Sequence, residues 1–294
     1  MAGIYIHIPY CKTRCIYCDF FTQTNMKTKP SLTRALSHEI ELRKAYIGEE
    51  TIDTIYFGGG TPSQLEKKDF EIVFDSIFNN YSVSADAEIT MEANPDDLTA
   101  EYIQMLRSLP FNRISIGVQS FDDSELKFLN RRHSAQRAKE AVKAIQDSGI
   151  SNISIDLMYG LPNQSMEVWT KNLNEAINLN VPHISSYHLI YEEGTKLFSL
   201  REQGKVKTAD EELSVDMFAK MIETLGRGGF EHYEISNFAK SGLYSKHNTS
   251  YWLGTKYLGI GPAAHSFDGT NRAENIHSIH KYIDAIDKKS PAVE

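Results

Sequence analysis

Apolar residues fall into six short runs that alternate with longer amphipathic stretches. The runs are rich in β-branched and aromatic residues, and they predict strands at 3–8, 51–57, 87–91, 112–118, 152–157 and 183–190. Apolar residues three and four positions apart predict helices at about 31–47, 66–79, 99–109, 134–148, 165–179 and 210–227. Alternation of this kind indicates parallel strands joined by right-handed crossovers.

Six strand–helix units are fewer than the eight that close a (β/α) barrel. We therefore predict an α/β fold, an open, partial (β/α)6 barrel whose lateral mouth would admit a large substrate. After residue 230 the pattern changes to a Gly- and aromatic-rich segment, with one more helix expected near 276–289. The prediction is a partial barrel at 1–230 and a small C-terminal extension at 231–294. Ser31 and Thr99 are expected to begin two of the helices.

Composition narrows the classes of partner. The chain has 294 residues, of which 41% are hydrophobic, enough for a packed core. Its 31 Lys and Arg against 39 Asp and Glu give a net charge of −8, which argues against nucleic acid as the main partner. The first strand begins directly after Met1, and no run approaches the ~20 apolar residues of a membrane span. We expect a cytoplasmic protein without a transmembrane segment.

The three cysteines of the chain stand together as Cys11, Cys15 and Cys18, directly after the first predicted strand. A C-x-x-x-C-x-x-C loop can bind three irons of a four-iron cubane and leave the fourth without a protein ligand. A zinc site usually takes four ligands, and only His7 lies close enough in sequence to complete such a set. A disulfide framework would need an even number of cysteines and an oxidising compartment. The spacing favours an iron–sulfur cluster.

Polar residues and glycines follow the other predicted strands, and in a (β/α) barrel such strand ends form the active site. The turn from Gly58 to Pro62 would let a ligand approach the main chain, although a tight strand-to-helix turn explains the glycines equally well. Glu92, Gln119 and Asp156 each end or follow a strand and are individually typical of caps and turns. Together they would suit hydroxyl, ammonium and carboxylate groups. Arg131 is either the cation for a carboxylate or a solvated residue at a helix start.

Four segments then carry a family resemblance. They are Tyr5-Ile-His-Ile-Pro-Tyr-Cys11 continuing to Cys18, Gly58-Gly-Gly-Thr-Pro62, Ser115-Ile-Gly-Val-Gln-Ser120 and Ile155-Asp-Leu-Met-Tyr-Gly-Leu-Pro162. They resemble the radical S-adenosylmethionine enzymes of the oxygen-independent coproporphyrinogen III oxidase family, over essentially the whole chain. The resemblance implies that the cysteines hold a [4Fe-4S] cluster whose fourth iron is chelated by S-adenosylmethionine. An electron from the reduced cluster would cleave this cofactor to methionine and a 5′-deoxyadenosyl radical.

The resemblance also assigns residues and partners. Tyr5 and Tyr17 would flank the cluster and the adenine, while Gly59, Gly60 and Thr61 would bind the methionyl end. The rest of the cofactor would be held by Glu92, Gln119, Arg131 and Asp156, and the strand end near Ile190 would pack on adenine. A low-potential donor such as flavodoxin or ferredoxin would supply the electron. An RNA substrate is disfavoured by the acidic composition.

Two features distinguish branches of this family. The oxidases resemble C-x-x-x-C-x-x-C-x-C, and Phe20 stands here at the place of the fourth cysteine. The segment containing His247, Asn248, Tyr251 and Trp252 resembles the H-N-x-x-Y-W signature of the family's heme chaperone branch. On chemistry alone, a histidine beside aromatics is either a heme ligand or a hydrogen-bonded structural residue.

The resemblance to the heme chaperone branch implies binding of heme or porphyrin and transfer of heme to recipient hemoproteins. Coproporphyrinogen III oxidation to protoporphyrinogen IX is the alternative. The family's chains continue into a further C-terminal domain, so this chain is expected to be shortened relative to them.

Overall fold

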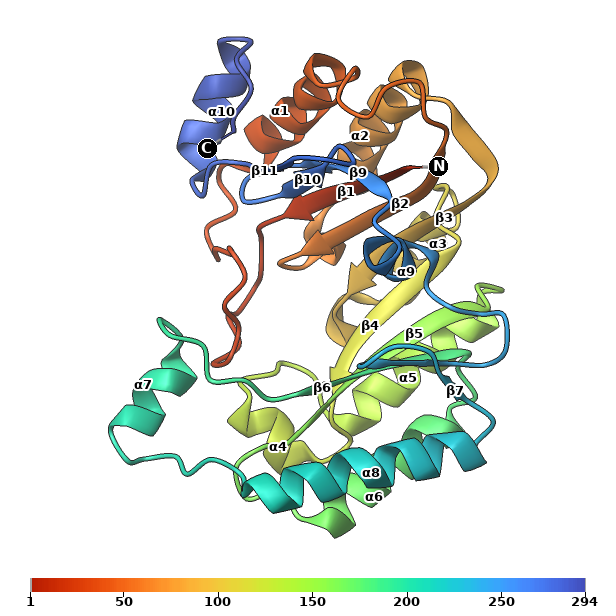
Figure 1. The fold of residues 1–294 in the computed structure, drawn as a ribbon, viewed down its shortest axis with the longest axis vertical. Helices are drawn as coiled ribbons and strands as arrows, with labels where there is room; N and C mark the ends of the chain where they lie inside the picture. Colours follow the sequence, from red (N-terminus) through yellow and green to blue (C-terminus); the bar gives the residue numbers. More distant parts are fainter. Residues whose placement is uncertain (1, 294) are drawn as a thin grey trace.

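The computed structural model describes residues 2–293, and within that range eleven strands form one mixed sheet (Figure 1). Their bounds are β1 Ala2–Ile8, β2 Ile52–Gly59, β3 Val83–Ala93, β4 Arg113–Gln119, β5 Asn152–Tyr159, β6 His183–His188, β7 Glu231–His232, β8 Asn237–Ala239, β9 Lys256–Ile260, β10 His265–Phe267 and β11 Arg272–Glu274. Across the sheet the order is β11-β10-β9-β1-β2-β3-β4-β5-β6-β8-β7. β1 to β6 pair in parallel with consecutive neighbours. Since β11 and β7 are the outer strands, the sheet is open.

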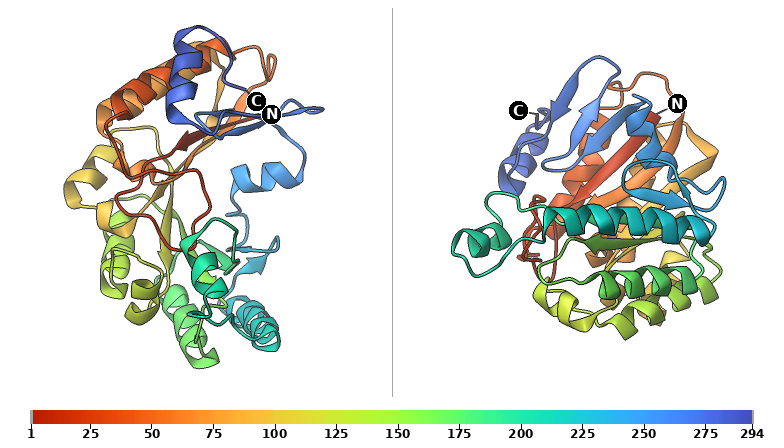
Figure 2. Two further views of the ribbon diagram at one scale, coloured as in Figure 1. Left: turned by 90° about the vertical axis from the view of Figure 1, so that its left-hand side faces the viewer. Right: turned by 60° about the horizontal axis from the view of Figure 1, so that its bottom comes forward.

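Helices connect the parallel strands and cover the outer face of the curved sheet (Figure 2). Their bounds are α1 Lys29–Leu42, α2 Lys67–Asn80, α3 Ala100–Leu106, α4 Asp123–Phe128, α5 Ala135–Asp147, α6 Met166–Asn178, α7 Lys196–Glu202, α8 Glu211–Arg227, α9 Lys246–Trp252 and α10 Ile279–Asp287, with short 3-10 turns η1 Pro62–Gln64 and η2 Pro95–Asp97. Each of β1 to β6 is followed by at least one helix. The predicted open, partial (β/α)6 barrel is confirmed.

Local side chains explain where the helices begin. The Thr99 hydroxyl accepts a hydrogen bond from the Tyr102 N–H, so Thr99 caps α3 as predicted. The prediction for Ser31 is wrong. α1 begins at Lys29, two residues earlier, because Pro30 fits the first helical turn, where its missing N–H costs nothing.

The core lies between the sheet and its outer helices. In β1 the alternate residues Ile4, Ile6 and Ile8 are fully buried, whereas Tyr5 packs against Tyr56 on the inner face. Alternation of side chains along a strand therefore separates a core-facing set from a set that faces the barrel interior. The interior set carries the polar and aromatic groups from which the site is built.

Residues after 230 extend this same sheet at both of its edges. β9 pairs in parallel with β1, and β10 and β11 follow in antiparallel order. At the other edge β8 pairs with β6 and then with β7. α10 packs on α1, and α9 packs against β2. A boundary after residue 230 stays a prediction. No helix within residues 2–293 is long and apolar enough to span a bilayer.

A buried polar network attaches the C-terminal residues to α1. The Arg43 guanidinium lies 3.1 Å from the Glu39 carboxylate and donates to the Gly259 carbonyl at 3.1 Å and to Asn275 at 3.2 Å. The Tyr282 hydroxyl of α10 donates to Glu39 at 2.5 Å. Burial raises the pKa of Glu39, and the neighbouring Arg43 acts in the opposite direction. These contacts join α1, β9 and α10 through groups that are almost fully buried.

Candidate cofactor-binding site

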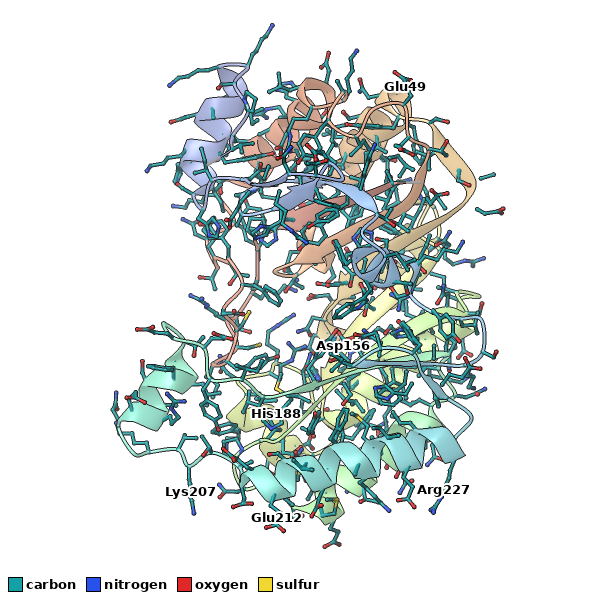
Figure 3. All side chains as sticks on the ribbon, viewed as in Figure 1. Glu49, Asp156, His188, Lys207, Glu212 and Arg227 are labelled. Atoms are coloured by element: carbon teal, nitrogen blue, oxygen red, sulfur yellow. The ribbon has the colours of Figure 1, made fainter. Side chains whose placement is uncertain are left out.

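A cavity of about 310 Å³ lies at the carboxyl ends of the parallel strands. This is within the usual range of roughly 300–1,000 Å³ for ligand pockets. Its walls contain all three cysteines. They also contain eight of the nine residues expected to bind the cofactor, namely Tyr17, Gly59, Gly60, Thr61, Glu92, Gln119, Arg131 and Asp156. Figure 3 labels Asp156 near the centre of the molecule. The ninth residue, Tyr5, is not among the lining residues, and its hydroxyl lies 3.2 Å from His7 Nδ1.

The cysteine loop leaves β1 and forms one wall of this cavity. Cys11, Cys15 and Cys18 are free thiols and only partly buried. The Thr61 hydroxyl lies 3.3 Å from the sulfur of Cys11, and the Arg131 guanidinium lies 3.4 Å from that of Cys15. Burial raises the pKa of the Cys18 thiol to about 11 and also raises that of Cys11. Metal binding at these sulfurs would therefore release protons at neutral pH.

An iron–sulfur cluster and a single metal ion require different arrangements of the thiols. Among residues 2–293 no three Cys, His, Asp or Glu side chains converge as ligands of one ion, as a zinc site would require. In a cubane each thiolate binds a different iron at a different corner, so the sulfurs need not converge. Three free thiols on one loop that line one cavity fit an iron–sulfur cluster.

The glycines at the end of β2 are required by close packing. A Cβ on Gly60 would lie 2.7 Å from the Ile8 carbonyl oxygen, and one on Gly59 would lie 2.5 Å from the His7 ring. Gly59 also has a φ of 103°, which glycine adopts without strain. The turn thus brings its main chain directly beside β1 and the start of the cysteine loop. The two explanations of these glycines, a tight turn and close approach of a ligand, are compatible, because Gly59, Gly60 and Thr61 all line the cavity.

Two acidic side chains in the cavity have raised pKa values. Burial raises the pKa of Glu92 to about 7, although Glu92 accepts a hydrogen bond from the Tyr56 hydroxyl at 2.8 Å. Burial likewise raises the pKa of Asp156 to about 6, against the opposing effect of Arg113. Near neutral pH these carboxyl groups are close to the point where they change between accepting and donating hydrogen bonds.

Arg131 and Gln119 complete the polar wall. The Arg131 guanidinium donates to the Gly117 carbonyl as well as to Cys15, so it is fixed beside the cysteine loop. Its Nε is buried and has no hydrogen-bond partner among residues 2–293, a donor that an oxygen atom of a ligand would satisfy. Gln119 has a φ of 70°, which is uncommon for a residue other than glycine. Such strain is often found at functional sites.

The cavity also contains residues that the sequence did not single out. These are Lys12, Asn94, Arg132, Met158 and Tyr187, among others. Tyr187 lies at the end of β6, where the sequence pointed instead to Ile190, a residue 63% exposed and outside the cavity lining. Glu92 and Gln119 were singled out because they lie at the carboxyl ends of strands, and the same criterion would also have identified Tyr187. Phe20, at the place of a fourth cysteine, lines the cavity and is 61% exposed.

The segment with the heme-chaperone signature forms α9, and none of its four predicted residues lines this cavity. His247 is 1% exposed. Its Nδ1 lies 2.8 Å from the Thr54 hydroxyl and its Nε2 lies 2.9 Å from the Tyr251 hydroxyl. Burial lowers the pKa of His247 to about 3, so the ring is neutral. In this structure both ring nitrogens are hydrogen-bonded, and the ring anchors α9 to β2.

The outer side of α9 has the opposite character. Trp252 is 65% exposed and Tyr251 is 40% exposed, while Asn248 is partly buried. Leu253, directly after the helix, is 76% exposed. Exposed large apolar side chains that gather on one short segment are typical of binding surfaces.

Comparison with known proteins places these features in a family. The profile of the Radical SAM superfamily matches residues 5–176. The heme chaperone HemW of Bacillus subtilis is 36% identical over 292 residues, which cover 98% of this chain and 77% of that protein. The heme chaperone HemW of Escherichia coli K12 is 39% identical over 265 residues, or 90% of this chain and 69% of that protein.

A solved structure supports the same fold. Coproporphyrinogen III oxidase HemN of Escherichia coli superimposes with a TM-score of 0.85 at 24% identity, over 99% of this chain and 70% of that chain. At this identity the likeness concerns the fold alone. The superfamily profile and the sequence identity to the two HemW proteins show the family as well as the fold. The chain belongs to the HemW family of the radical SAM superfamily.

Proposed function

We propose that this protein is a heme chaperone that binds a [4Fe-4S] cluster, S-adenosylmethionine and heme, and that transfers heme to hemoproteins. The observation that carries the proposal is its similarity, over nearly the whole chain, to proteins named heme chaperone HemW. Phe20 at the place of a fourth cysteine supports a chaperone over an oxidase. The three free thiols agree with a reducing, cytoplasmic location.

The cavity residues take the following roles in this proposal. Cys11, Cys15 and Cys18 would hold the cluster, and Arg131 would keep a positive charge beside the loop. Glu92 and Asp156 would bind hydroxyl or ammonium groups of S-adenosylmethionine. The main chain of the Gly-rich turn and Thr61 would bind the methionyl end, with Gln119 and Tyr17 completing the walls.

When bound, the cluster and S-adenosylmethionine supply one-electron reductive cleavage of the sulfonium, and a flavodoxin or ferredoxin is the proposed electron donor. The residues that line the cavity would hold the cofactor in one orientation. Glu92, Gln119 and Asp156 approach from three different strands, so a ligand in this cavity is fixed from several sides.

The exposed side of α9 is the proposed heme surface. Trp252 and Tyr251 offer aromatic faces on which a flat macrocycle can pack, and Asn248 lies on the same helix. His247 would ligate the iron only after its Nε2 gives up the contact with the Tyr251 hydroxyl. Packing on Trp252 therefore requires less rearrangement of the helix than ligation by His247.

A heme titration followed by the Soret band tests the proposal. We expect saturable binding of one heme per chain, and a Kd about 10-fold higher in Trp252→Ala, which corresponds to about 1.4 kcal/mol. Phe78→Ala is the matched control, because Phe78 is an exposed aromatic residue on α2 (44% exposed). Absence of saturable binding, or equal effects of the two substitutions, would count against this surface.

Coproporphyrinogen III oxidation remains the second candidate, because the HemN structure shares this fold. The reconstituted protein should cleave S-adenosylmethionine anaerobically without forming protoporphyrinogen IX. Sustained formation of that product would replace the chaperone by the oxidase.

A further inference from the structure

Asp97, in η2, lies behind the cavity wall and accepts hydrogen bonds from four side chains. Its Oδ1 accepts from Lys12 Nζ at 2.8 Å and from the Arg132 guanidinium at 3.0 Å. Its Oδ2 accepts from the Ser63 hydroxyl at 2.9 Å and from the Gln64 amide at 2.5 Å. The Asp97 side chain is only 2% exposed. Two cations on one oxygen and two neutral donors on the other use most of the acceptor capacity of a carboxylate.

These donors come from three separate segments of the cavity wall. Lys12 lies inside the cysteine loop, between Cys11 and Cys15. Ser63 and Gln64 follow the Gly-rich turn directly. Arg132 is the neighbour of Arg131, the residue that contacts the sulfur of Cys15. One buried carboxylate therefore joins the cysteine loop, the Gly-rich turn and the arginine segment.

Asp97 is itself held in place from the side of β3. The Asn94 side chain caps η2 by accepting from the Asp96 N–H at 3.1 Å, and the Asn94 N–H donates to the Ser63 hydroxyl at 3.2 Å. Asp97 does not line the cavity, whereas Lys12, Asn94 and Arg132 do. Its influence on a ligand must therefore pass through the residues it holds.

We propose that Asp97 is a positioning residue that fixes the three cysteines, the Gly-rich turn and Arg131 in one geometry for S-adenosylmethionine. The inference rests on the proposed function, since it concerns the cofactor assigned there. Partners that orient the residues around a metal or cofactor commonly change affinity by about 10- to 100-fold when replaced.

The test compares Asp97→Asn with Asp96→Asn. An amide at position 97 replaces one acceptor oxygen by an N–H donor, which would face either the two cations or the Ser63 and Gln64 donors. Asp96 is the matched control, because its side chain is 23% exposed and its contact with Arg132 is 3.9 Å long. Both substitutions remove one negative charge, and the two positions are adjacent in the chain. The variants therefore differ in whether the four hydrogen bonds to Asp97 are kept.

Two readouts separate positioning from general stability. In the reconstituted protein, S-adenosylmethionine is titrated against the electron paramagnetic resonance signal of the reduced cluster. We expect Asp97→Asn to raise the apparent Kd by about 10- to 100-fold, while Asp96→Asn stays within about 2-fold of the unsubstituted protein. In the metal-free protein, hydrogen exchange of residues 11–18 should be faster in Asp97→Asn alone.

A folded Asp97→Asn protein with unchanged affinity and unchanged exchange would overturn the inference. If Asp97→Asn does not fold, Lys12→Gln takes its place, because the Lys12 side chain is 52% exposed and its loss spares the core. Faster exchange of residues 11–18 with a raised Kd is then expected, and unchanged values of both would overturn the inference. If the unsubstituted protein does not bind S-adenosylmethionine, the proposed function falls together with the inference.

Discussion

At the scale of single residues, position in the fold decides which side chains are available for chemistry. Glu92 and Asp156 share a cavity with three cysteines, although they are far apart in sequence. His247 carries the most recognisable signature of the C-terminal segment, yet its ring is buried and hydrogen-bonded at both nitrogens. The sequence identified His247 as a side chain that can ligate iron. Whether its ring can reach a ligand depends on neighbours such as Thr54 and Tyr251, which are not apparent from the sequence.

The raised pKa of Glu92 predicts a pH dependence of stability in the metal-free protein. The pKa rises from 4.5 to about 7 on folding, so the folded state binds a proton that the unfolded state has lost. This contribution is fully present below about pH 4.5 and is lost as the pH rises through about 7. Relative to Glu92→Gln, the free energy of unfolding should fall by roughly 3 kcal/mol across this range.

Urea unfolding at a series of pH values checks this prediction. Glu101→Gln serves as the control, because Glu101 lies on the exposed surface of α3. Parallel pH profiles for the unsubstituted protein and Glu92→Gln would show that Glu92 ionises as freely in the folded chain as in the unfolded one.

At the scale of elements, the six strand–helix units were predictable because each strand and each long helix repeats its own period. β3 begins at Val83, earlier than expected, since Ser84 and Asp86 at its start are polar and break the apolar run. α4, α7 and α9 were missed, as each has only six or seven residues, too few to establish a helical period. α3 is equally short, but Thr99 marks its start. The pairing of β9 with β1 depends on contacts distant in sequence, which local patterns do not contain.

The Glu39–Arg43 network predicts how firmly the C-terminal elements are attached. Arg43→Ala would leave Glu39 buried without its cation and would remove the hydrogen bonds to Gly259 and Asn275. Loss of one partner from a buried pair costs about 3–5 kcal/mol. Lys44→Ala, at an exposed neighbouring position, should change the stability by less than about 0.5 kcal/mol.

Chemical denaturation measures this difference, and hydrogen exchange in β9 and α10 locates it. We expect faster exchange in both elements of Arg43→Ala. A loss below 1 kcal/mol would mean that the network contributes little to the attachment of these elements.

At the scale of the whole molecule, the inner side of the open sheet carries two surfaces with different proposed tasks, because His247 of α9 stacks on Tyr56 of the inner face. The cavity at the strand ends gathers thiols, carboxyl groups and a guanidinium, while the outer side of α9 presents Trp252 and Tyr251. The parallel part of the fold and the place of Glu92, Gln119 and Asp156 in the cavity could be predicted from the order of the strands and the convergence of their carboxyl ends, whereas Lys12, Asn94 and Tyr187 were not singled out. The separation of the two surfaces could not be predicted, because it depends on where α9 packs against β2.

Transfer of heme to an acceptor protein distinguishes a heme chaperone from a protein that only binds heme. The protein is loaded with one equivalent of heme and mixed with increasing concentrations of a heme-free respiratory cytochrome, and the Soret band is followed in time. We expect a transfer rate that rises with acceptor concentration and exceeds the rate of heme release to a scavenger. A rate that is independent of the acceptor and equal to simple release would contradict the proposed chaperone function.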